Sequence, residues 1–100
     1  MMKTGFNVTP VITIPTANDV QILGPNPNRV AVVLDAPTAN RYTVTWDAAA
    51  VIGRGISMIL GVQPLIITRE QFGSVIGLPM RAIASGASVN ISFIEIVEEP

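Results

Sequence analysis

The chain has 100 residues, of which 49% are hydrophobic and only 13% charged, and it contains neither His nor Cys. An average soluble domain carries about 25% charged residues, so the composition favours burial of apolar surface beyond the monomer. Without Cys there is no disulfide or thiolate metal site, and without His the usual general base and metal ligand are missing. We therefore expect no enzyme, cofactor or metal, and the net charge of −1 does not support nucleic acid binding.

The length supports a single domain over residues 1–100, because a chain of this size can bury a core without staples. Residues 1–5 lead directly into alternating sequence rather than into a continuous apolar segment, so no secretory signal is expected. A membrane helix needs about 20 consecutive apolar residues, and the sequence has no such run. We expect no membrane partner.

Short strands dominate the first third of the chain, because β-branched residues recur at period two between clusters of Gly, Pro and Asn. Phe6–Ile14 is the first predicted strand, and Pro10 suggests an edge position because proline cannot donate to a ladder. Asp19–Leu23 is the second, and Gly24–Asn28 ends it. Arg29–Asp35 is apolar on both faces, which predicts a central strand.

The middle of the chain continues the β pattern after a turn at Ala36–Asn40. Arg41–Trp46 alternates cleanly and is expected to have one solvated face. Asp47–Gly55 is interpreted as a loop because its glycines would end a helix quickly. Ile56–Leu60 and Leu65–Thr68 are predicted to pair as a hairpin.

The last third begins with a break in the β pattern at Arg69–Ile76. Thr68 with Gln71 resembles a capping box, so a helical turn is expected there. Met80–Ala84 and Val89–Val97 are the closing strands, joined by a turn at residues 85–88.

The final predicted strand is irregular, because Ile94 and Ile96 put apolar groups on the face opposite Phe93. A bulge near Phe93 and Ile94 would account for this pattern. A partner subunit that covers the outer face would account for it equally well.

About seven or eight short strands without a long crossover helix predict an all-β fold, either an antiparallel β-sandwich or a jelly-roll-like barrel. Two chemical alternatives stay open. Asp35 and Asp47 could pair as carboxylates in an enzyme. Tyr42 and Trp46 share a strand face and could stack on a base or a sugar, although a place in the core or an interface is favoured because Val44 lies between them.

A family resemblance is carried by two segments. Pro25–Arg29 followed by Val30–Leu34, and the later Met80–Ser85 with its closing strand, resemble small structural proteins of tailed bacteriophages. In such proteins an Asn-Pro-Asn-Arg turn leads into a core strand, and an Ala-Ile-Ala strand precedes the last hairpin.

The resemblance implies a non-enzymatic virion protein, a capsid decoration or cement protein or a minor head protein. It would be assembled in the host cytoplasm in many copies, contacting the major capsid protein, other virion proteins or its own copies. The alternative is a receptor- or carbohydrate-binding module of a phage tail or fibre. The candidate contact residues are Phe72, Leu78, Met80, Ile94 and Ile96, with Arg29 and Arg81 fixing the register.

Overall fold

The computed structural model describes residues 3–37, 40–46, 50, 55–59 and 63–99, and these form ten short β-strands and one short helix with a 3-10 extension. The first strands are β1 (Lys3–Val8), β2 (Ile12–Ile14), β3 (Val20–Leu23), β4 (Arg29–Leu34) and β5 (Arg41–Trp46). The remaining elements are β6 (Ile56–Ile59), β7 (Leu65–Thr68), α1 (Arg69–Phe72), the 3-10 segment η1 (Gly73–Gly77), β8 (Met80–Ser85), β9 (Val89–Ile91) and β10 (Ile94–Glu99). The expected mostly β architecture is confirmed.

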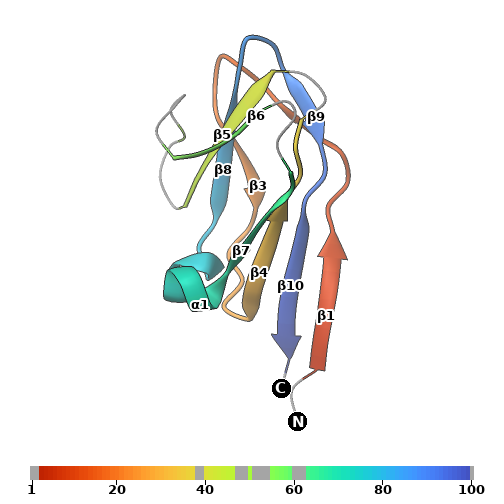
Figure 1. Ribbon diagram of the computed structural model, residues 1–100, viewed down its shortest axis with the longest axis vertical. Coiled ribbons are helices and arrows are strands. Elements are labelled where there is room, and N and C mark those ends of the chain that lie inside the picture. Colours follow the sequence, from red (N-terminus) through yellow and green to blue (C-terminus); the bar gives the residue numbers. More distant parts are fainter. Residues whose placement is uncertain (1–2, 38–39, 47–49, 51–54, 60–62, 100) are drawn as a thin grey trace.

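Two four-stranded sheets and one two-stranded sheet contain these strands (Figure 1). Sheet I has the order β1-β10-β4-β7, sheet II has the order β3-β8-β5-β6, and β2 pairs with β9. The described pairs are all antiparallel. Sheets I and II each keep two edge strands, so the described strands form no closed barrel.

One apolar core receives side chains from all three sheets. Its fully buried members include Ile14, Val32, Leu34, Tyr42, Val44, Ile67, Met80, Ala82 and Phe93. The Tyr42 and Phe93 rings meet edge to face with centroids 5.9 Å apart, which is a favourable arrangement for aromatic quadrupoles. The Tyr42 hydroxyl donates to the Asp35 carbonyl oxygen, so its one polar group is satisfied inside the core.

Local patterns located several elements correctly. β4 lies between β10 and β7, as its two apolar faces predict. The capping box is present, because the Thr68 hydroxyl accepts from the Gln71 amide and the Gln71 side chain accepts from the Thr68 amide. Pro10 lies in the break after edge strand β1.

Two predicted strands are each divided in the structure, which accounts for ten strands where about eight were expected. Phe6–Ile14 becomes β1 and β2, which belong to different sheets. Val89–Val97 becomes β9 and β10, separated at Ser92 and Phe93. Phe93 is fully buried, and its amide donates to the Thr9 hydroxyl at 2.8 Å, so the two breaks lie opposite each other.

The predicted hairpin between Ile56–Leu60 and Leu65–Thr68 is wrong. β6 pairs with β5 in sheet II, whereas β7 pairs with β4 in sheet I. β8 and the closing strands likewise lie in different sheets. Local alternation identifies a strand but carries no information about its partner, because the pairing is long-range.

The solvated face expected for Arg41–Trp46 is also absent, since no residue of β5 is exposed. Thr43 is buried on the face opposite Tyr42, and its hydroxyl lies 2.9 Å from the Ser57 hydroxyl. The predicted loop Asp47–Gly55 falls largely outside the described residues. No described helix has the length and apolar character needed to cross a membrane.

Candidate interaction surface

An apolar row crosses all four strands of sheet I. Residues directly opposite each other on neighbouring strands lie on the same face of a sheet. Val8 lies opposite Ile94, and Ile94 lies opposite Val33. Val33 in turn lies opposite Ile66 on β7. The four side chains therefore form one line from edge to edge.

A second row on the same face lies two residues further along each strand. Phe6 is opposite Ile96, and Ile96 is opposite Ala31. On β7 this row ends at Thr68, which lies opposite Ala31. We call the surface made by the apolar residues of both rows the outer face of sheet I; it consists of Phe6, Val8, Ala31, Val33, Ile66, Ile94 and Ile96. The core residues Val32 and Ile67 pair with each other on the opposite face.

Most of the outer face is open to solvent within the part of the chain that the structure describes, although Ala31 is only 6% exposed. Phe6 is 70% exposed, and Val8 and Ile66 are each 56% exposed. Ile94, Ile96 and Val33 are half-buried. Single exposed apolar residues are ordinary, but contiguous rows of them mark contact sites or aggregation hazards.

A shallow hollow of about 260 Å³ indents the outer face. Its apolar lining comes from Val8, Val33, Ile94 and Pro64, and Asp35 and Ser92 add polar groups. A hollow of this size and lining suits a protruding apolar side chain of another protein.

The inner face of sheet I carries a buried arginine because of a bulge in β4. Ile96 pairs with Ala31 but Val97 pairs with Arg29, so Val30 is an extra residue in the ladder. Strict alternation would place Arg29 on the face opposite Val32. The extra residue brings the two onto the same side, and Arg29 is only 1% exposed.

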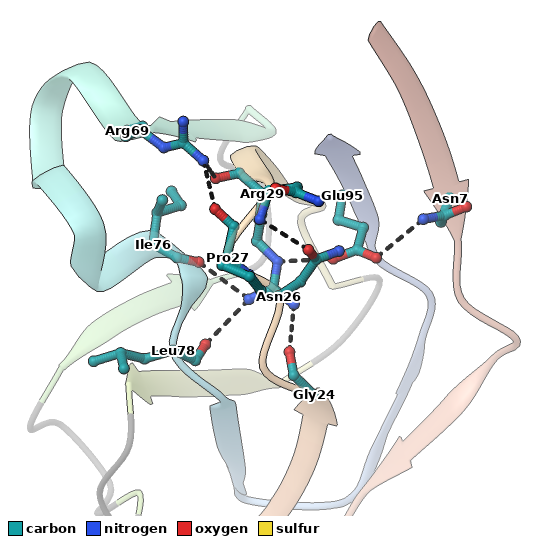
Figure 2. Close-up of polar contacts among 10 residues, drawn as sticks. Asn7, Gly24, Asn26, Pro27, Arg29, Arg69, Ile76, Leu78 and Glu95 are labelled. Atoms are coloured by element: carbon teal, nitrogen blue, oxygen red, sulfur yellow. Dashed lines mark hydrogen bonds and ion pairs between the residues drawn. The ribbon is translucent and has the colours of Figure 1, made fainter. Parts of the chain in front are cut away.

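Figure 2 shows how the Arg29 guanidinium is satisfied. Its Nε donates to Glu95 Oε2 at 2.7 Å. One terminal nitrogen donates to the carbonyl oxygens of Ile76 and Leu78, both at 3.1 Å, and the other donates to the Gly24 carbonyl. Arg29 therefore ties the turn before β4 and the segment after α1 to β10.

Arg69 reinforces this cluster from α1 (Figure 2). One terminal nitrogen donates to the carbonyl oxygens of Pro27 and Arg29 at 2.9 and 2.8 Å. A hollow of about 590 Å³ lies beside the two arginines and is otherwise lined mainly by Pro, Gly, Ile and Leu residues. Among the described residues that line it, Ser74 supplies the one further polar side chain, so the described lining does not combine an acid with a base.

A second ion pair fixes the start of β3. Arg81 Nε donates to Asp19 Oδ2 at 2.6 Å, and the Ala50 amide donates to the same oxygen at 2.9 Å. The hydrogen bond from Arg81, followed by that from Ala50, lowers the pKa of Asp19 below its ordinary value. The same pair raises the pKa of Arg81.

The predicted contact residues separate into three groups. Ile94 and Ile96 lie on the outer face, and Phe72 and Leu78 are exposed elsewhere, near α1. Met80 is fully buried.

Both arginines also have partners within the chain. Arg29 is buried against Glu95, and Arg81 binds Asp19. Met80 is enclosed by the core, and Arg29 is enclosed by the acceptors that its guanidinium binds. Neither side chain can contact a partner, so both are removed from the candidate contact residues. Alternation in the sequence showed which positions of each strand are apolar. It did not show which of them face away from the core, because that depends on the bulge in β4 and on the order of the strands.

Sequence reasoning missed Val33 and Ile66 as contact residues, and it covered Phe6 and Val8 only as part of the edge strand Phe6–Ile14, which could add to a neighbouring sheet. Phe6 and Val8 have period-two spacing, which was a usable signal. The pairing that aligns them with Ile94 and Ile66 joins strands far apart in the chain, and this could not be read locally.

The structure bears in different ways on the two chemical alternatives, the carboxylate pair of Asp35 with Asp47 and the stacking surface of Tyr42 with Trp46. Asp35 is exposed, while Asp47 lies outside the described residues. No group of three or more His, Cys, Asp or Glu residues that could hold a metal occurs in the described part of the chain. Tyr42 is fully buried, and Trp46 is half-buried with its ring 5.4 Å from that of Phe72, so the two do not form an exposed stacking platform.

Comparison of the chain with models of protein families, with curated proteins and with solved structures gives no match.

Proposed function

We propose that this chain is a non-enzymatic structural protein that assembles with other proteins through the outer face of sheet I. The observation that carries the proposal is the apolar row that crosses every strand of that sheet. A monomer gains nothing from Val8, Ile66 and Phe6 in water. Each 100 Å² of apolar surface covered by a partner would contribute about 2.5 kcal/mol before the entropy cost of association is subtracted.

The assembly we propose is the virion of a tailed bacteriophage, with this chain as a capsid decoration, cement or minor head protein. Its partner would be the major capsid protein or another virion protein. The support is the resemblance of the Asn-Pro-Asn-Arg turn and of Met80–Ser85 to such proteins. We interpret sheets I and II as the two layers of a β-sandwich, a rigid support that fits a scaffold for contacts.

The alternative of a carbohydrate-binding module has less support. The two aromatic residues predicted to stack on a sugar are not available together, because Tyr42 is enclosed in the core while Trp46 packs against Phe72. An exposed apolar sheet face suits a protein partner better than a sugar, because sugars need several convergent polar groups.

Incorporation into particles tests the proposal. Virions of the phage that encodes the chain would be purified on a density gradient from cells that supply either the wild-type protein or a variant. We expect wild type to band with the particles and Ile66→Lys to stay with free protein. The matched control is Ile59→Lys, since Ile59 is 47% exposed but lies on sheet II, and it should band like wild type. Absence of wild type from the band, or normal incorporation of Ile66→Lys, would refute the proposal.

A further inference from the structure

We infer that edge strand β1 pairs with β1 of a second copy of this chain, antiparallel and about a two-fold axis through Phe6. This inference rests on the proposed function and names a further partner, which binds the edge of sheet I beside the outer face. It starts from an imbalance: all six residues of β1 are exposed, and the strand adds no side chain to the core. Ordering a strand costs backbone entropy, and the hydrogen bonds of its ladder return little net stability. Pairing with a further strand would therefore stabilise β1 more than any other strand.

The backbone of β1 presents a regular set of hydrogen-bonding groups at its free edge. The Thr9 amide donates to the Phe93 carbonyl, and the Glu98 amide donates to the Asn28 carbonyl. In an antiparallel ladder the inward and outward residues alternate. Odd-numbered residues of β1 therefore face β10, and Thr4, Phe6 and Val8 direct their amides and carbonyls away from the sheet. Figure 1 shows β1 at the right margin, with none of the described strands beyond it.

This pattern is complementary to itself. A two-fold axis through Phe6 sets Phe6 opposite Phe6 of the second copy, and Thr4 opposite the second copy's Val8. The three outward residues of each strand then meet as hydrogen-bonded pairs, whereas other registers leave at least one of them without a partner.

The charges agree with this register. Lys3 is the only charged residue of β1, and it lies opposite the second copy's Thr9 rather than its Lys3. Lys3 shares the inner face with Asn7, whose amide nitrogen donates to Glu95 at 3.1 Å. The two-fold axis therefore brings Lys3 toward the side of the second copy that carries Glu95. No like charges face each other across the pair.

Edges that proteins keep free are usually blocked by a central charge, a proline or a bulge. β1 has none of these between Thr4 and Val8. The other edge of sheet I, β7, is shorter and runs directly into α1. Pairing through β1 would join the two copies of sheet I into one continuous sheet, with both outer faces on the same side.

Disulfide trapping tests the register, because the chain has no Cys of its own. Hydrogen-bonded antiparallel pairs have Cα atoms about 5.5 Å apart, within the range of about 4.4–6.8 Å that a disulfide needs. Under mild oxidation we expect Phe6→Cys to form a covalent dimer by itself. Thr4→Cys and Val8→Cys should crosslink when mixed but not separately. Ile66→Cys, at the opposite edge, should stay monomeric. Crosslinking of Thr4→Cys with Phe6→Cys in place of this set, or none above the Ile66→Cys level, would overturn the register.

Sedimentation velocity tests the pairing without cysteines. Wild type should dimerise with increasing concentration, and Thr4→Pro should dimerise at least about ten-fold more weakly because it removes an outward amide. Thr4→Val keeps that amide and should match wild type, and circular dichroism should show all three folded. A monomer at every concentration, or an unchanged Thr4→Pro dimer, contradicts the inference. Ile66→Lys should still dimerise, so a failure of particle binding can be told from a failure of pairing.

Discussion

Arg29 holds more of the structure together than any other charged residue among those described. Its guanidinium contacts Glu95 on β10 and three carbonyl oxygens on two separate connecting segments. Nearly complete burial of a cation is costly unless its donors are satisfied. The Asn-Pro-Asn-Arg turn therefore has a physical role in this chain, because it delivers the arginine to these acceptors.

Replacing Arg29 should be severe. Arg29→Met leaves Glu95 without its cation and three carbonyls without a donor, so the free energy of unfolding should fall by about 3–5 kcal/mol. Arg69→Met is the control, since Arg69 is half-exposed and binds two carbonyls; its loss should be about 1 kcal/mol. Urea denaturation measures both. Equal losses would mean that the Arg29 network adds little.

The Asp19–Arg81 pair predicts an acid-sensitive contribution to stability. The pKa of Asp19 is lowered in the folded state from its ordinary value of 3.8. The pair therefore stabilises the fold fully above pH 3.8, and this contribution is lost as pH falls through the lowered value. The carboxyl carbon shift of Asp19, followed by NMR, should titrate below 3.8 in wild type and closer to 3.8 in Arg81→Gln. An Arg69→Gln control should leave the titration unchanged, and an unshifted Arg81→Gln curve would exclude the pair as the cause.

At the scale of elements, the bulge at Val30 decides which side chains face the core. Alternation in the sequence groups Val30 with Val32 and Leu34, and separates them from Arg29. The extra residue reverses the position of Arg29 alone. Strand type and approximate bounds of β4, β5 and β7 could be predicted from alternation, but the bulge could not, because it arises from pairing with β10.

Deleting one valine from β4 tests the role of the bulge. Without Val30 the ladder becomes regular and Arg29 stays opposite Val97, so the melting temperature should fall by less than about 8 °C, or roughly 1 kcal/mol for a chain of this size. Deleting Val33, also a half-buried valine of β4, should shift the register and turn apolar side chains to the wrong face. Thermal unfolding followed by circular dichroism would show a cooperative transition only for the first. Similar behaviour of both deletions would argue against the bulge.

At the scale of the whole molecule, the apolar residues that make the sequence poor in charge are divided between the core and the outer face of sheet I. Composition predicted the excess of apolar surface, and the irregular alternation of Ile94 and Ile96 predicted an apolar outer side on the last strand. That this side continues through Val33 to Ile66 depends on the order β1-β10-β4-β7. Strand order joins segments distant in the chain, and for that reason the candidate site was predicted only in part.

The central claim is that the outer face is covered in the assembled state. Hydroxyl-radical footprinting with mass spectrometry, applied to the free protein and to purified particles, measures this directly. Phe6, Val8 and Ile66 should be oxidised in the free protein and protected in particles, while Ile59 on sheet II is oxidised in both. Unchanged oxidation of Phe6, Val8 and Ile66 on assembly, with protection at Ile59, would contradict the account.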